Sequence, residues 1–223
     1  MWKETTIRNI KCCLYDSNSS DALLLQPLGA EEIGSLGEEL RQITAAAARP
    51  FSFCGFAVEN WNRDLSPWEA PPAFGDEPFG GRAEETLRFV LDALLPALGG
   101  QARPVILGGY SLAGLFSLWA AAETGAFDGV AAASPSVWFP GWGGYQTAHP
   151  IRAKAVYLSL GRHEERTRNR VMAPVGDNIR ALFDALQRDP ACAACTLEWN
   201  DGGHFSDPVG RTARAFAWAL GHV

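Results

Sequence analysis

Short apolar runs alternate with longer helix-like segments along the whole chain, and this alternation restricts the fold more than any other feature. Strands are predicted over residues 22–26, 51–58, 104–108, 127–133, 154–160 and 196–199. Helices are predicted between them, over residues 31–48, 83–98, 112–123, 177–188 and 212–220. Strands separated by helices need crossover connections, which produce a parallel sheet covered on both faces. The sequence therefore predicts a three-layer α/β fold.

No shift in composition divides the chain, so residues 1–223 are expected to form a single domain. Residues 59–81 and 134–150 are rich in proline, glycine and aromatic side chains, and we expect both to be long loops. Residues 138–154 leave no room for a helical cap, which predicts an open cleft.

The charge balance limits the partners that such a chain can bind. It has 19 Lys and Arg against 25 Asp and Glu, a net charge of −6, and no long basic run, so nucleic acid is not an expected partner. No apolar stretch approaches the roughly 18 residues that cross a bilayer, so no membrane is expected either. The first residues carry mixed charge and lack the apolar core of a signal peptide, which predicts a cytoplasmic protein.

The five cysteines suggest structural thiols rather than a redox or metal centre. Cys192 and Cys195 have C-x-x-C spacing, but zinc would need a second pair with suitable spacing. The pair follows Asp189-Pro190 and precedes a strand, whereas a redox motif opens a helix. We expect no metal and no cofactor, and a thiol oxidoreductase is the most distant of the alternatives.

The segment Val-Ile-Leu-Gly-Gly-Tyr-Ser-Leu-Ala-Gly, residues 105–114, leads a strand into a helix through a sharp turn at Ser111. Such a turn holds a serine in a strained conformation with its hydroxyl above the sheet. Gly109 and Ala113 are small, as the close approach of strand and helix requires. The N–H of Leu112, at the helix N-terminus, could stabilise a developing oxyanion. The alternative is a Gly/Ser-rich turn that binds a phosphate.

A serine nucleophile needs a base, and the base needs an orienting acid. His204 follows the last strand in a Gly-Gly turn and is the expected base; the alternative is an ordinary polar loop histidine. Glu164 and Glu165 follow the strand over 154–160, at the same edge of the sheet. Either could be the acid, or both could be solvated surface charge.

Further candidates come from the loops at this edge. The backbone N–H of Leu28, in the loop after residues 22–26, is the expected second oxyanion donor beside Leu112. Trp61, Arg63 and Trp138 could receive an aromatic, sugar-like or anionic acyl ester. The alternative is that the tryptophans pack the irregular loops.

These motifs together resemble the α/β-hydrolase superfamily, and within it the esterases that include esterase D, enterobactin-type siderophore esterases, feruloyl esterases and mycolyltransferases. The turn at Ser111 matches the nucleophile elbow, residues 134–138 resemble the Ser-x-Ser-x-Trp segment of the siderophore esterases, and residues 159–164 and 203–205 resemble the acid and histidine loops. The similarity extends over about residues 22–221. The chain is expected to lack the N-terminal antiparallel strands that are usual in the superfamily, with at most one strand at residues 7–15.

The resemblance implies a serine hydrolase that cleaves small carboxylic esters through a Ser111–His204–Glu164 triad and an acyl-enzyme. An acyltransferase on the same scaffold is the first alternative. A non-catalytic binding module is the second, and it predicts that Ser111 and His204 lie too far apart for proton transfer.

Overall fold

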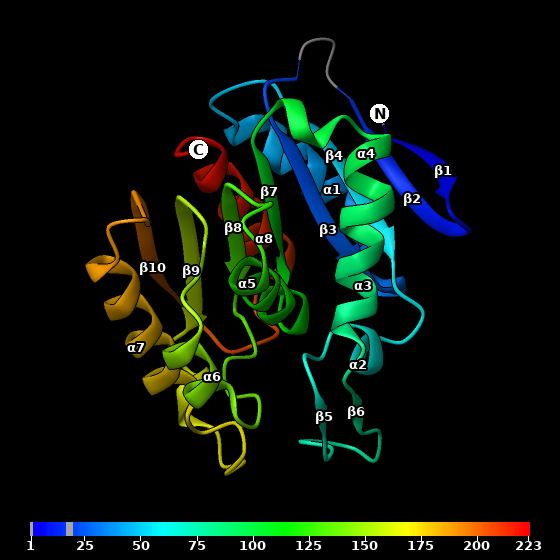
Figure 1. The fold of residues 1–223 in the computed structure, drawn as a ribbon. Coiled ribbons are helices and arrows are strands. Elements are labelled where there is room, and N and C mark those ends of the chain that lie inside the picture. Colours follow the sequence, from blue (N-terminus) through cyan, green and yellow to red (C-terminus); the bar gives the residue numbers. More distant parts are fainter. Residues whose placement is uncertain (1, 17–19) are drawn as a thin grey trace.

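The computed structural model describes residues 2–16 and 20–223 and is built around one eight-stranded sheet with the order β1-β2-β4-β3-β7-β8-β9-β10 (Figure 1). Its strands are β1 (Lys3–Ile7), β2 (Ile10–Tyr15), β3 (Leu23–Leu28), β4 (Ser52–Ala57), β7 (Val105–Tyr110), β8 (Gly129–Ala133), β9 (Ala155–Gly161) and β10 (Ala194–Asn200). From β4 to β10 every neighbouring pair is parallel. The prediction of a mostly parallel central sheet is confirmed.

The N-terminal edge of the sheet differs from the expectation of at most one strand. β1 and β2 form an antiparallel hairpin, and β2 continues the sheet by pairing antiparallel with β4. The tight turn between them is made by Arg8 and Asn9, both with positive φ, which matches the right-handed twist of a two-residue hairpin. β1 is largely exposed and mostly polar, so its sequence lacks the apolar signal by which the inner strands were recognised.

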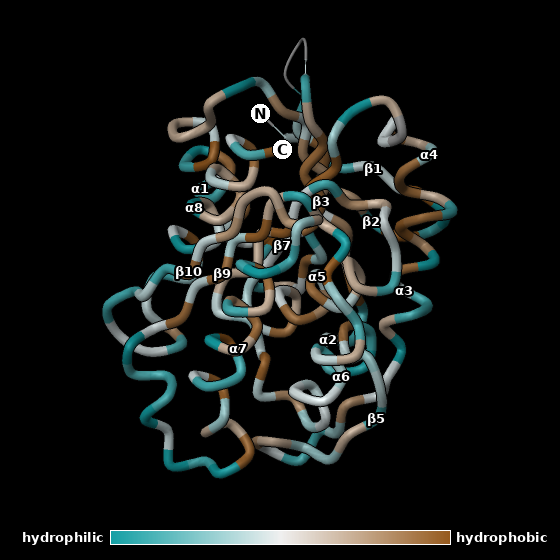
Figure 2. Tube along the Cα trace, turned by 60° about the vertical axis from the view of Figure 1, so that its left-hand side comes forward, coloured by the Kyte–Doolittle hydropathy of each residue, from teal (hydrophilic) through white to brown (hydrophobic). Residues whose placement is uncertain are grey.

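Helices cover both faces of the sheet (Figure 1). α1 (Ala30–Ala46) and α8 (Pro208–Leu220) pack together on one face, and their core includes Leu24, Phe53 and Phe216. The other face carries α3 (Ala83–Phe89), α5 (Leu112–Glu123) and α7 (Val175–Arg188). Figure 2 shows the hydrophobic residues concentrated in the strands between these layers. No helix in the described ranges has both the length and the apolar character needed to cross a bilayer.

The two long segments predicted as loops contain short elements. Residues 59–81 hold α2 (Trp61–Asp64) and a small antiparallel pair, β5 (Glu69–Ala70) and β6 (Phe79–Gly80), and residues 134–150 hold α6 (Trp142–Ala148). The remaining short elements are the π-helical turn η1 (Val90–Leu94), α4 (Leu95–Ala97), η2 (Gly100–Ala102) and η3 (Glu164–Arg166). No separate cap domain is formed by the described residues. In Figure 1, α2, α6 and the β5–β6 pair lie at the lower edge, where the parallel strands end.

One buried carboxyl interrupts the apolar packing between α1 and β3. Glu39 is 4% exposed and Gln26 is 2% exposed. Burial raises the pKa of Glu39 to about 8, although a hydrogen bond with Gln26 opposes the shift. The folded protein therefore holds this carboxyl protonated at a pH where the unfolded chain, with a pKa of 4.5, has ionised it.

Glu39 makes stability fall as pH rises. Below pH 4.5 the group is protonated in both states, and between 4.5 and about 8 only the folded state keeps the proton. The free energy of unfolding should therefore fall by about 1.4 kcal/mol per pH unit in that window. Glu39→Gln should remove this slope in urea titrations at pH 5 to 8, whereas the exposed neighbour variant Glu38→Gln should retain it. An unchanged slope in Glu39→Gln would contradict the assignment.

Candidate active site

Ser111 lies at the sharp turn between β7 and α5, as the sequence predicted. Its backbone has φ 58° and ψ −118°, a strained conformation for a residue with a side chain. A Cβ on Gly109 would come within 2.6 Å of the Ala113 Cβ, and one on Gly114 within 3.1 Å of the Gly109 carbonyl oxygen. The small residues around Ser111 are therefore required by the contact between strand and helix.

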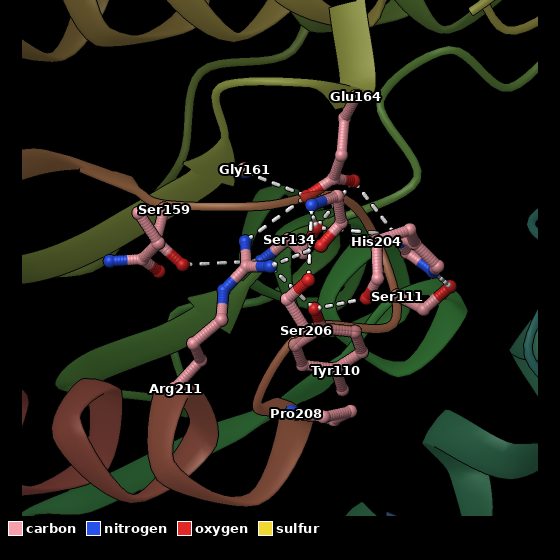
Figure 3. Close-up of polar contacts among 12 residues, drawn as sticks. Tyr110, Ser111, Ser134, Ser159, Gly161, Glu164, His204, Ser206, Pro208 and Arg211 are labelled. Atoms are coloured by element: carbon pink, nitrogen blue, oxygen red, sulfur yellow. Dashed lines mark hydrogen bonds and ion pairs between the residues drawn. The ribbon is translucent and has the colours of Figure 1, made fainter.

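The hydroxyl of Ser111 contacts the imidazole of His204, and the imidazole contacts Glu164 (Figure 3). His204 Nε2 lies 3.0 Å from Ser111 Oγ, and its Nδ1 lies 2.7 Å from Glu164 Oε2. The three residues follow β7, β9 and β10, whose parallel C-terminal ends bring them to one edge. The alternative of a non-catalytic binding module predicted that Ser111 and His204 lie too far apart for proton transfer, and the distance of 3.0 Å contradicts it.

Glu164 is held by four groups and is 7% exposed. Besides His204, it accepts hydrogen bonds from Ser134 Oγ (2.5 and 2.7 Å to its two oxygens), the Gly161 N–H (2.7 Å) and Arg211 Nη2 (3.2 Å). Burial by itself would raise the pKa of Glu164, but the contacts with His204, Ser134 and Gly161 outweigh burial and lower it. The carboxylate is therefore ionised and fixed in direction.

Arg211 is a charged side chain at the centre of this network, and the sequence analysis did not identify it. It comes from α8 and is 1% exposed. Its Nη1 donates to the Tyr110 hydroxyl at 2.7 Å, and that hydroxyl donates to the His204 carbonyl oxygen at 2.6 Å. Arg211 thus connects the acid, the end of β7 and the histidine loop.

Two further serines, Ser134 and Ser136, surround the site, and their Ser-x-Ser spacing was the only sequence signal for them. Ser134 has a positive φ of 45° and lies 3.3 Å from His204 Nδ1, so it is on the acid side of the imidazole. Ser136 Oγ lies 3.2 Å from Ser111 Oγ, and its N–H donates to the Ser111 carbonyl. Only Ser111 faces Nε2, the nitrogen opposite the acid.

The two expected oxyanion donors have different surroundings. Leu112 is the first residue of α5, so its N–H has no partner within the helix. Leu28 is the last residue of β3 rather than part of a loop, and its carbonyl accepts from Val58 N–H at 3.0 Å. The next amide, that of Gly29, donates to Glu32 Oε2 at 3.1 Å. The donor role of Leu28 stays a prediction.

The expected substrate-contacting residues are mostly engaged with protein. Arg63 Nε lies 2.7 Å from Asp64 Oδ1, and its Nη2 lies 3.4 Å from Glu59, so its charge is already neutralised. Trp138 is 7% exposed and packs on Phe74 and Phe79. Its position fits the alternative in which the tryptophans pack the loops.

Trp61 is the expected substrate residue that lies beside the end of β3. It is half-buried, and its ring would lie 3.3 Å from a Cβ placed on Gly29. Its ring therefore flanks the Leu28–Gly29 backbone, where the second oxyanion donor is expected.

The other acid candidate and two of the other histidines do not contact Ser111 or His204. Glu165 Oε2 pairs with Arg180 Nη2 at 2.6 Å, so Glu164 alone of the two acids reaches His204. His149 and His222 stack on Tyr145 and Trp218.

The C-x-x-C pair has the surroundings of structural thiols. Burial is the main cause that raises the pKa of the Cys192 thiol to about 11, and burial also raises that of Cys195. Redox cysteines instead have lowered thiol pKa values.

Several solved structures match this chain, although no protein-family model matches its sequence and no curated protein matches it significantly. Siderophore hydrolase EstA from Aspergillus nidulans aligns with a TM-score of 0.72 and 20% identity, covering 95% of this chain and 90% of its own. An IroE-like serine hydrolase from Shewanella oneidensis gives 0.74 and 16%, covering 97% and 79%. Enterobactin hydrolase IroE in complex with DFP gives 0.65 and 15%, covering 99% and 94%.

The chain has the α/β-hydrolase fold, with no separate cap in its described ranges. Within that fold it is similar in structure to siderophore and enterobactin esterases, as the motifs around Ser111, Glu164 and His204 indicated. The expectation of at most one strand before residue 22 was wrong, because two strands, β1 and β2, precede β3.

Proposed function

We propose that this protein is a serine hydrolase that cleaves carboxylic esters, with Ser111 as nucleophile, His204 as base and Glu164 as the orienting acid. The observation that carries the proposal is the continuous contact from Ser111 Oγ to His204 Nε2 (3.0 Å) and from His204 Nδ1 to Glu164 Oε2 (2.7 Å). These are hydrogen-bonding distances at which a proton can pass from hydroxyl to imidazole.

The reaction follows from that contact. His204 Nε2 removes the proton of Ser111 as Oγ attacks the ester carbonyl carbon, and Glu164 stabilises the imidazolium that forms. The N–H groups of Leu112 and Leu28 hold the oxyanion, each worth about 3 kcal/mol in the transition state. Collapse of the tetrahedral intermediate expels the alcohol, which takes the proton from His204. Water then attacks the acyl-enzyme with His204 again as base.

Two observations support an ester as the substrate. In the described ranges no separate cap covers the edge of the sheet that carries Ser111, which fits a substrate with a bulky alcohol or acyl group. Structural neighbours of this chain are described as siderophore and enterobactin hydrolases, so siderophore esters belong among the substrates to be tried. Trp61, beside the end of β3, is the proposed aromatic contact for the substrate.

Labelling with a fluorophosphonate probe tests this function. Intact-mass and peptide analysis should find one adduct, on Ser111, and Ser111→Ala should lose both the adduct and the hydrolysis of 4-nitrophenyl acetate. Ser134→Ala is the matched control, because it removes a hydroxyl from the same network and should still be labelled. An adduct on Ser134, or full activity in Ser111→Ala, would overturn the assignment.

An ester panel that includes enterobactin then defines the substrate. Adding an alcohol to these assays separates hydrolysis from acyl transfer, because transfer would give a new ester in place of the free acid.

A further inference from the structure

Three arginines on the segment that follows the acid have no counter-charge. Arg166, Arg168 and Arg170 are exposed, and in the described ranges their side chains form no ion pair or hydrogen bond. Some exposed arginines elsewhere pair with neighbours, as Arg41 does with Glu38 and Arg88 with Glu84. Arg8, Arg152 and Arg188 are also exposed without an ion pair in the described ranges, but they are far apart in the sequence. In a chain of net charge −6, this segment is a local concentration of positive charge. The sequence analysis missed it because the arginines alternate with other residues.

The segment begins at the proposed active site. Glu164 opens η3 and Arg166 ends it, so the first of the three arginines is two residues from the acid. A chain extends at most about 3.6 Å per residue, which keeps the backbone of Arg170 within about 22 Å of Glu164.

A series of contacts joins the segment to the other side of the site. Asn169 Nδ2 donates to the Ala73 carbonyl at 2.6 Å, in the loop between β5 and β6. The adjacent Phe74 packs on Trp138, with ring centroids 6.5 Å apart. Trp138 follows Ser136, whose hydroxyl lies 3.2 Å from that of Ser111. The segment that carries the three arginines is therefore linked to the loops around Ser111, and in Figure 1 it lies at the lower edge with α6 and the β5–β6 pair; we call these loops the rim of the site.

Exposed large apolar side chains are found on the same rim. Within the described ranges they are Phe74 (58% exposed), Val171 (42%) and Phe205 (91%). Phe74 and Val171 belong to the two segments that Asn169 connects, and Phe205 follows His204, with their ring centroids 5.2 Å apart. Apolar side chains left in water on loops around a site are typical of a binding surface.

From these observations we infer that Arg166, Arg168 and Arg170 form a subsite for a negatively charged group of the ester substrate. The inference rests on the proposed function and specifies its substrate class: an ester whose apolar part contacts Phe74, Val171 or Phe205 and whose far end carries a carboxylate or a similar anion. Guanidinium groups bind carboxylate and phosphate oxygens through paired, charge-assisted hydrogen bonds. Arg63, by contrast, is already neutralised by Asp64 and Glu59.

A pair of esters that differ only in charge tests the subsite. The mono-4-nitrophenyl ester of suberic acid carries a free carboxylate, and its methyl-capped diester is neutral with the same leaving group. The native protein should have the higher kcat/KM on the anionic ester, and this preference should shrink as salt screens the arginines. The triple variant Arg166→Gln, Arg168→Gln, Arg170→Gln should raise KM for the anionic ester about tenfold at unchanged kcat. The neutral ester should change less than about twofold, because it offers the arginines no charge.

A second triple variant controls for the loss of charge in general. Lys3→Gln, Lys11→Gln and Arg188→Gln removes three exposed cations that form no ion pair in the described ranges and lie in β1, in β2 and at the end of α7. It should leave both KM values unchanged. Equal effects of the two triple variants, or an equal effect of the first on both esters, would overturn the subsite.

The neutral ester separates failure of the subsite from failure of the proposed function. If the native protein hydrolyses the neutral ester but shows no preference for the anionic one, the subsite alone is wrong. If it hydrolyses neither ester and takes no fluorophosphonate, the proposed function is wrong and the subsite falls with it.

Discussion

His204→Ala is expected to lower kcat for 4-nitrophenyl acetate by at least about 10⁴-fold. Nε2 is 3.0 Å from Ser111 Oγ, and the variant removes the group that we propose takes the serine proton. Binding contacts and the oxyanion donors remain, so KM should change far less than kcat. Stopped-flow or spectrophotometric assays of nitrophenolate release measure both constants.

His163→Ala and His149→Ala are the matched controls for this effect. His163 is exposed and lies one residue before Glu164, and His149 stacks on Tyr145 away from the triad. Both variants should retain nearly full kcat. A His204→Ala protein that still turns over at the native rate would remove general-base catalysis by this residue.

The elements that bring the triad together could be predicted because each has a local sequence signal. The sharp turn at Ser111 can be recognised from a few residues. Strand and helix pack so closely there that only small side chains fit at Gly109 and Ala113. Strand and helix alternation then places the loops after β9 and β10 at the same edge. The order along the chain and the parallel sheet were sufficient to select His204, and Glu164 or Glu165, as candidates.

The choice between Glu164 and Glu165 could not be made from the sequence, because adjacent residues differ only in the direction of their side chains. η3 turns Glu164 toward His204 and Glu165 toward Arg180 on α7. Arg211 could not be found either. It lies within an amphipathic helix, and its partners Glu164 and Tyr110 are 47 and 101 residues away in the chain.

The residues expected to contact a substrate were the least predictable part of the candidate site. Aromatic residues in irregular loops can face either solvent or the protein, and Trp138 faces the protein whereas Phe205 faces solvent. Arg63 has Asp64 beside it in α2 and Glu59 four residues earlier, before the helix begins, so a cation there is neutralised locally. Within residues 2–16 and 20–223, no acidic side chain reaches Arg166, Arg168 or Arg170, which is visible only from the folded chain.

Arg211→Met should lower the free energy of unfolding by about 3–5 kcal/mol, because it leaves a buried carboxylate without its fixed cation. Glu164 is 7% exposed and Arg211 is 1% exposed, so water cannot replace the lost charge without opening the core. The Tyr110 hydroxyl loses its donor as well. Urea unfolding at pH 7 followed by circular dichroism measures the change.

Arg214→Met, one helical turn further along α8, is the matched control for Arg211→Met. Its side chain is 45% exposed and pairs with Glu198 and Asp207 at the surface, so its loss should cost no more than about 1 kcal/mol.

Lowering the pH gives a second signature of Glu164. Its folded pKa lies below 4.5, so the stability it contributes is present above pH 4.5 and is lost as pH falls through the folded value. If Arg211 stabilises the ionised carboxylate, this acid-induced loss should be smaller in Arg211→Met than in Arg214→Met. Equal unfolding free energies and equal acid profiles for the two variants would show that the buried ion pair does not hold the acid in place.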